Sequence, residues 1–270
     1  MKKLISLLLI LTIGVGISMG QTKEIKTVGT FSKISFRVPG KLVLRQGTPQ
    51  KVELEGDKEA LAKIETELKG DKLIIGNEER WNWGWRDNDR IMVYITVKDI
   101  TGLSVSGSGE LITEGKITTD QLDLNVSGSG SLQTDVNVSG DMDANVSGSG
   151  RIDVKGSCKR IDSDISGSGK VVAALTISEV ASIGISGSGK FECSGTAKEI
   201  KTNISGSGKV YAANLEVDIC NVRISGSGDV EINVKSELDA NISGSGTVSY
   251  KGSPSHVNGN SSGSGKVRKM

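Results

Sequence analysis

The chain lacks an excess of either charge, a second long hydrophobic run and more than one histidine. Its 33 Lys and Arg stand against 32 Asp and Glu, and 31 basic residues remain once Lys2 and Lys3 are set aside. This balance argues against nucleic acid or an anionic membrane surface as a partner. Beyond the N-terminal run, no apolar stretch is long enough to span a membrane, so the mature chain is expected to have no transmembrane segment.

The scarcity of histidine also argues against an enzyme. The single histidine, His256, lies in a polar stretch where solvation is expected, and no nucleophile–base pair can be built around it. The many serines repeat, whereas an activated serine has its own environment. The glycine–aspartate nonapeptide of calcium-binding solenoids is missing. The sequence therefore predicts no catalytic residues, no cofactor and no metal site.

The N-terminus is typical of a secretory signal peptide over residues 1–20. Lys2 and Lys3 precede an apolar run from Leu4 to Ile13, and small residues follow. Ser18 and Gly20 fit the −3 and −1 positions of a cleavage site, which predicts cleavage before Gln21. A membrane anchor is the alternative, but the run is short and followed by glycines. The mature protein is expected to be exported: periplasmic, associated with the outer surface, or secreted.

A repeated Ser-Gly-Ser-Gly motif dominates the rest of the chain and accounts for many of its 36 glycines. Nine copies occur at intervals of 21, 20, 19, 20, 19, 20, 18 and 19 residues, beginning at Ser106, Ser127, Ser147, Ser166, Ser186, Ser205, Ser225, Ser243 and Ser262. A flexible Gly/Ser linker has no such period. A period near 20 residues is typical of one turn, or rung, of a solenoid.

Apolar residues recur at fixed places around the motif and alternate with polar ones. One row stands directly before the motif (Val105, Val126, Val146, Ile165, Ile185, Ile204, Ile224 and Ile242), and Ser261 breaks it in the last copy. Similar rows lie five residues before the motif and just after it. Asparagine or another polar residue usually stands beside the first row. Alternation with period two predicts two short strands per rung, each with one buried face, and the glycines turn the chain between them.

The three cysteines fit this grid as core residues. Cys193 and Cys220 fall in two different apolar rows and Cys158 at another corner position, so none stacks on another. Buried free thiols are the favoured interpretation and a disulfide the alternative. Four aspartates, Asp123, Asp143, Asp162 and Asp239, recur four residues before the motif. They are not expected to form one unbroken ladder, which disfavours a cation site.

Residues 21–105 form an N-terminal β section, continuous with the repeat solenoid of residues 106–270. Strands are predicted at Ile34–Val38, Lys41–Gln46, Lys51–Glu55, Leu73–Ile75 and Ile91–Val97. Asp57 is a good N-cap, and Leu61, Ile64 and Leu68 follow at helical spacing up to Gly70. One short amphipathic helix is therefore expected over residues 58–69. The predicted fold is all-β: a right-handed parallel β-helix with about 20 residues per rung.

All three tryptophans gather in one polar segment between two predicted strands. Trp81, Trp83 and Trp85 alternate with polar residues, so an extended segment would place the three rings on one side. The rings and their neighbours Arg80, Asn82 and Arg86 suit stacking on sugars or anchoring a protein partner. The alternative is that the rings pack over the flank of the solenoid. These six residues are the candidate binding site.

Segments of the chain resemble the putative auto-transporter adhesin, head GIN domain family. The resemblance rests on units such as Asn203-Ile204-Ser205-Gly206-Ser207-Gly208, and on Phe31-Ser32-Lys33-Ile34 leading to Val43-Leu44-Arg45-Gln46-Gly47. It runs from Phe31 to Lys266. It implies an exported protein of the bacterial cell envelope with a β-helical fold. It carries over no functional residues.

Together these features predict a non-enzymatic adhesin or surface module whose partner is a glycan or an envelope protein. The alternative is a structural spacer or a self-assembling envelope component, a homo-oligomer joined through β edges. Lys266, Arg268 and Lys269 on the last strand would discourage such pairing. A polysaccharide-acting enzyme on a β-helix is the least favoured function, since no carboxylate or basic cluster marks one.

Overall fold

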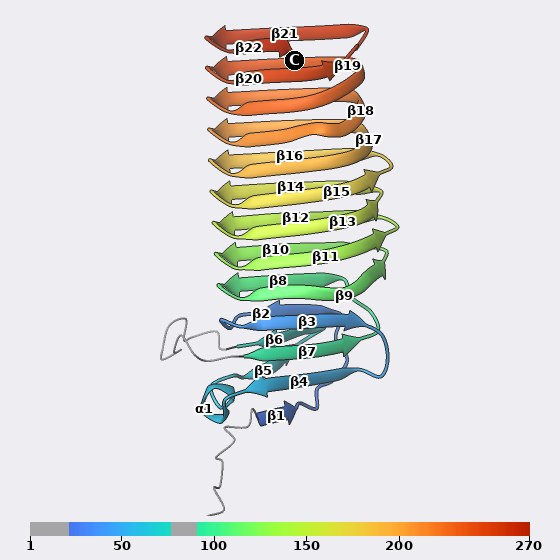
Figure 1. Ribbon diagram of the computed structural model, residues 1–270, viewed down its shortest axis with the longest axis vertical. Coiled ribbons are helices and arrows are strands. Elements are labelled where there is room, and N and C mark those ends of the chain that lie inside the picture. Colours follow the sequence, from blue (N-terminus) through green and yellow to red (C-terminus); the bar gives the residue numbers. More distant parts are fainter. Residues whose placement is uncertain (1–21, 77–90) are drawn as a thin grey trace, which may run out of the picture.

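The computed structural model describes residues 22–76 and 91–270. Within these ranges the chain forms 22 strands and one short helix, and all the strands belong to one hydrogen-bonded sheet that winds into a β-solenoid of about 20 residues per turn. Figure 1 shows the rungs stacked in a column. No helix in the described ranges is long and apolar enough to cross a membrane.

Each rung of the repeat region has one strand that runs into the motif and one that leaves it. We call the two stacks of these segments the leading sheet and the trailing sheet. The leading sheet contains β8 (Gly102–Gly107), β10 (Leu122–Gly128), β12 (Asp141–Gly148), β14 (Arg160–Gly167), β16 (Val180–Gly187) and β21 (His256–Gly263). The trailing sheet contains β9 (Glu110–Thr119), β11 (Ser131–Val138), β13 (Arg151–Cys158), β15 (Lys170–Ile177), β20 (Thr247–Gly252) and β22 (Lys266–Lys269).

Three longer strands contribute to both sheets without a break. In β17 (Lys190–Gly206), β18 (Lys209–Gly226) and β19 (Asp229–Gly244) the first part belongs to the trailing sheet and the last part to the leading sheet. The rungs pair in parallel, and the motif residues stack in register, although the register shifts within the pairings of β9 with β11, β17 with β18 and β18 with β19. Ser127 pairs with Ser147, and Ser205 with Ser225. The motif corners therefore stack along one edge of the column, where the leading strands end in Figure 1.

The predicted apolar rows form the core between the two sheets. Every residue of the row before the motif, from Val105 to Ile242, is at most 3% exposed. Most residues of the core are Val, Ile, Leu or Ala, and the largest fully buried side chains are Phe36 and Phe191. The last rung differs: the whole of β21 is exposed, and Val257 is 42% exposed. The prediction of two half-buried strands per rung is confirmed.

The motif corner is tight because each chain passes directly over the one before it. The first glycine of the motif has positive φ, as at Gly187 (φ +111°), where a Cβ would stand 2.7 Å from the carbonyl oxygen of Gly167. The second glycine of the motif faces the core, where a Cβ on Gly189 would overlap the side chain of Ile165 in the preceding rung. Ser186 and Ser188 are exposed. The glycines thus form the corner, and the serines face solvent.

The N-terminal section extends both sheets and then departs from the parallel pattern. Its strands are β1 (Thr22–Ile25), β2 (Lys33–Phe36), β3 (Lys41–Gln46), β4 (Lys51–Gly56), β5 (Thr66–Lys69), β6 (Lys72–Ile75) and β7 (Met92–Val97). The five predicted strands correspond to β2, β3, β4, β6 and β7. β2 pairs in parallel with β8, and β3 with β9. Beyond them β4, β1 and β5 add antiparallel pairs.

The predicted helix over residues 58–69 is wrong in its length. Helix α1 spans only Lys58–Leu61, and Thr66–Lys69 is strand β5. Gly70 (φ +62°) does not end a helix but turns the chain between β5 and β6, where Leu68 pairs with Leu73. Leu61 and Ile64 are buried as predicted, whereas Leu68 is 38% exposed. Pairing with β6 satisfies the backbone of β5, so the helical spacing holds for only one turn.

All three cysteines are free and buried, as the repeat pattern predicted. Burial raises the pKa of each thiol, at Cys158, Cys193 and Cys220, to about 12. They are small core residues, held as unreactive thiols at neutral pH.

Two glycines at the same position of the motif allow the energetic cost of backbone strain to be measured apart from the cost of a steric clash. We predict that Gly187→Ala lowers the urea midpoint much more than Gly107→Ala. Both have positive φ, which alone costs an alanine roughly 1–3 kcal/mol, but a Cβ on Gly107 meets nothing within 4 Å. Unfolding followed by circular dichroism checks this. Equal losses would show that contact between corners is unimportant.

A second pair of variants tests the buried hydroxyls. The Ser163 hydroxyl donates to the carbonyl oxygen of Ala144 at 2.6 Å. These two residues lie where the regular pairing of β12 with β14 is interrupted. The Thr202 hydroxyl is buried and has no partner among the described residues. We expect Thr202→Val to raise, and Ser163→Ala to lower, the free energy of unfolding by about 1 kcal/mol each. Loss of stability in Thr202→Val would contradict this.

Candidate functional site

Polar rows cover the outer face of the leading sheet. The residue two positions before each motif and the first serine of the motif both point outward, because they flank the buried apolar row. We call these the asparagine row (Asn125, Asn145, Asp164, Gly184, Asn203, Arg223, Asn241 and Asn260) and the serine row (Ser127, Ser147, Ser166, Ser186, Ser205, Ser225, Ser243 and Ser262). Neighbours within a row are about 4.8 Å apart.

An open groove of about 930 Å³ runs between these two rows, from Asp164 to Ser262. We call it the motif groove. Asparagine-row and serine-row side chains form its walls. The Ile204 side chain is buried in the core, so its backbone lies on the floor. The groove crosses six successive strand segments, and its length is therefore about 24 Å at the strand spacing.

The groove is almost neutral. Of the residues that line it, Asp164 and Arg223 alone are charged. The others offer amides, hydroxyls and backbone groups. On the opposite side of the asparagine row lies a second hollow of about 280 Å³, lined by Lys201, Asn221 and Asp239. Asn203, Arg223 and Asn241 line both hollows and form the ridge between them.

Hydrogen bonds hold part of the asparagine row in place. Asn260 donates to Oδ1 of Asn241 at 3.3 Å, and Asn241 donates to Oδ1 of Asp239 at 2.8 Å. Lower in the row, the backbone N–H of Asp164 donates to Oδ1 of Asn145. The Asp164 carboxylate lies over Gly184, occupying the space that a Cβ there would need. Gly184 is therefore a gap in the row that makes room for a carboxylate.

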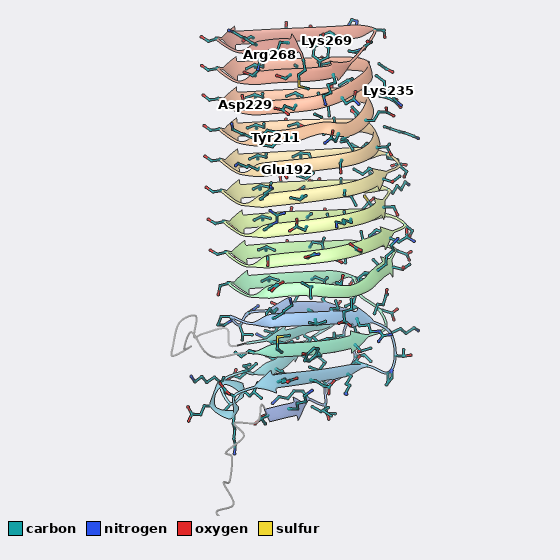
Figure 2. The ribbon with its side chains drawn as sticks, viewed as in Figure 1. Glu192, Tyr211, Asp229, Lys235, Arg268 and Lys269 are labelled. Atoms are coloured by element: carbon teal, nitrogen blue, oxygen red, sulfur yellow. The ribbon has the colours of Figure 1, made fainter. Side chains whose placement is uncertain are left out.

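The outer face of the trailing sheet is different, because several of its charged side chains form ion pairs. Lys170 lies 2.7 Å from Glu192, and Lys209 lies 3.2 Å from Asp229. Arg151 forms a two-pronged contact with Asp153. Figure 2 labels Glu192, Tyr211 and Asp229 on this sheet. Such mutually satisfied side chains leave fewer groups for a ligand than the rows beside the motif groove.

Three of the four aspartates stack on consecutive rungs of the leading sheet and the fourth does not, so the four form no unbroken ladder, as expected. Asp123 pairs with Asp143, and Asp143 with Asp162, while Asp239 stands apart. Burial and the neighbouring Asp123 raise the pKa of Asp143. Burial and Asp164 raise that of Asp162. No group of three or more His, Cys, Asp or Glu is arranged to hold a metal in the described part of the chain.

The six candidate residues of the tryptophan segment, Arg80, Trp81, Asn82, Trp83, Trp85 and Arg86, lie outside the described residues. Their role in binding stays a prediction. His256 is exposed, as expected. The motif groove was not foreseen. Its asparagine row is visible in the sequence, but spacing does not show that two outward rows leave a hollow between them.

We predict that Asp143→Asn stabilises the fold at pH 7 and gives no gain at pH 3. The pKa of Asp143 is raised in the folded state, which means that folding disfavours the charged carboxylate. This free-energy cost is present at pH 7. It disappears once the carboxyl is protonated in both states, below its ordinary pKa of about 3.9. Urea midpoints at both pH values check this.

The matched control is Asp135→Asn. Asp135 pairs in register with Lys116 and Lys155, so the loss of its charge should give no stabilisation at either pH. Equal effects of the two substitutions would contradict repulsion along the aspartate ladder.

Three solved structures resemble the whole fold. A putative adhesin from Parabacteroides merdae ATCC 43184 has a TM-score of 0.69 and 20% identity, covering 94% of this chain and 97% of that one. A putative adhesin from Parabacteroides distasonis ATCC 8503 has a TM-score of 0.69 and 24% identity, covering 94% and 98%. A putative lipid binding protein from the same strain has a TM-score of 0.68 and 22% identity, also covering 94% and 98%. At these identities the likeness concerns the fold alone.

Among curated proteins, none matches the sequence significantly. The sequence does match the family model described as putative auto-transporter adhesin, head GIN domain, over residues 30–193 and 178–254. These matches contain strands β2 to β20, all the stacked corners except the last, and most of the motif groove. Because they span most of its 270 residues, the chain belongs to the putative auto-transporter adhesin, head GIN domain family.

Proposed function

We propose that this protein is a non-enzymatic, exported surface-binding module that holds a glycan chain in the motif groove. The observation that carries the proposal is the groove itself: about 930 Å³ of open, nearly neutral space between two rows of hydrogen-bonding side chains. The groove is elongated and open, which suits a chain more than a compact ligand. A glycan has hydroxyls along its whole length that can both donate and accept.

The repeat of the rows supports a polymeric ligand. Asparagine and serine side chains recur about every 4.8 Å, so a polymer laid along the column meets similar groups at each step. Asn203, Ser205 and Ser225 form no side-chain hydrogen bond with another described residue, and all three are exposed. A bound sugar would therefore gain hydrogen bonds without breaking existing ones between side chains.

Cell-surface location is part of the proposal. Residues 1–20 have the features of a signal peptide, and cleavage before Gln21 would release a mature chain outside the cytoplasm. The family description, an adhesin head domain, supports a place at the surface. The proposal assigns no reaction to the groove, because its serines occupy equivalent positions on successive rungs, and none is distinguished as a nucleophile.

Binding of residues 21–270 to a glycan array and to cell-envelope extracts tests the proposal. We expect the quadruple variant Asn203→Ala, Ser205→Ala, Ser225→Ala, Asn241→Ala to bind at least 10-fold more weakly, because several polar contacts of about 1 kcal/mol each are removed. The control variant Ser194→Ala, Asn214→Ala on the trailing sheet should bind like the wild type. Failure of the folded protein to bind any glycan would overturn the proposal.

A second variant, Trp81→Ala, Trp83→Ala, Trp85→Ala, tests the tryptophan segment separately. If it alone loses binding while the groove variant keeps it, the site lies in that segment and not in the groove. Phospholipid vesicles form a further arm, because one of the similar structures is named a lipid-binding protein. Binding to vesicles but to no glycan would contradict a glycan ligand.

A further inference from the structure

Arg223 is the one cation in the lining of the motif groove. It pairs in register with Asn203 on one side and Asn241 on the other, so a guanidinium interrupts a run of amides. It is exposed and lines both hollows of the leading sheet. Its side chain forms no ion pair or hydrogen bond with any residue in the described ranges.

The acids of the neighbouring strands already have other partners. Asp239 accepts from Asn241 at 2.8 Å and from Asn258 at 3.5 Å. Glu199 lies 3.5 Å from the ammonium of Lys201 and accepts from Asn221. Asp164 stands three rungs away in the same row, about 14 Å at the strand spacing. The guanidinium of Arg223 is therefore left open to the groove.

An exposed guanidinium without a partner in the described part of the protein is suited to bind a carboxylate. Its planar fork of N–H donors matches the two oxygens of a carboxylate, and such charge-assisted pairs are roughly twice as strong as neutral hydrogen bonds. Asn203 and Ser225 beside it can hydrogen-bond the hydroxyls next to that carboxylate. A carboxylate flanked by hydroxyls is the chemical signature of an acidic sugar.

The charge count of the groove limits how acidic the ligand can be. One arginine can neutralise one anionic group, and Asp164 repels a second that lies near it. A densely sulfated chain would bring several negative charges into a groove that has a single cation. The groove suits a glycan whose carboxylates are widely spaced.

We propose that the motif groove selects a glycan with spaced carboxylates, and that Arg223 is the residue that determines this specificity. This inference rests on the proposed function, since it names the class of glycan that the same groove takes.

Isothermal titration with oligosaccharides of equal length tests the inference on residues 21–270. The probes are hyaluronan hexasaccharide, with a carboxylate on every second sugar, its methyl ester, neutral chitohexaose and a heparin hexasaccharide. We expect the acid form to bind at least 10-fold more tightly than its ester, and its affinity to fall as salt rises. Arg223→Gln should reduce the affinity for the acid form to that for the ester. Arg223→Lys should recover only part of it, because an ammonium lacks the fork.

Arg151→Gln is the matched control. Arg151 is an exposed arginine of the trailing sheet that already pairs with Asp153, so its loss should leave the affinity for every probe unchanged. Equal unfolding midpoints of the wild type and Arg223→Gln would show that the fold is intact. If the acid and its ester bind equally, or Arg223→Gln binds like the wild type, the inference falls and the proposed function survives. Tighter Arg223-dependent binding of heparin would overturn the assignment to spaced carboxylates. If none of the four oligosaccharides binds, the inference falls, and the glycan array decides whether the proposed function falls with it.

Discussion

Close contact between successive backbones at the motif corner is the constraint on which the rest of the structure depends. Each corner lies so near the one before it that only hydrogen atoms fit between the glycine α-carbons and the carbonyls beneath, as at Gly187 and Gly167. Once the corners are stacked, the strand residues next to them pair in register, and like residues fall above like. The core rows and the polar rows of the outer faces both follow from this contact.

In-register stacking has a cost as well as a use. Identical neighbours suit apolar and neutral polar side chains, which pack or hydrogen-bond with their own kind. Charged side chains repel when stacked: Asp143 lies between Asp123 and Asp162, and its pKa is raised first by burial and then by these neighbouring carboxylates. On the trailing sheet Arg151, Lys170 and Lys190 also stack, and neighbouring acids offset part of the repulsion. The asparagine row consists mainly of neutral residues, and a single charge such as that of Arg223 is therefore conspicuous.

The sequence was most informative where the structure repeats. Eight equivalent positions made the row from Val105 to Ile242 evident, and the corners, the buried thiols and the parallel rungs followed from it. The helix predicted over residues 58–69 was too long. Leu61, Ile64 and Leu68 fit a helical spacing, but spacing alone does not show that β5 pairs with β6. The motif groove went unseen for a related reason: spacing shows which residues share a face, but not whether two outward rows leave a hollow between them. The tryptophan segment, a singular feature of the sequence, remains a prediction.

The even register of the rungs makes the length of the column adjustable in whole steps. A duplicated or deleted unit of about 20 residues would keep every corner above a corner, and would add or remove one member of each row. A partial unit would displace apolar residues to the surface. The motif groove would lengthen or shorten by the same step, about 4.8 Å. Duplication of the repeat could therefore set the length of the motif groove in whole steps.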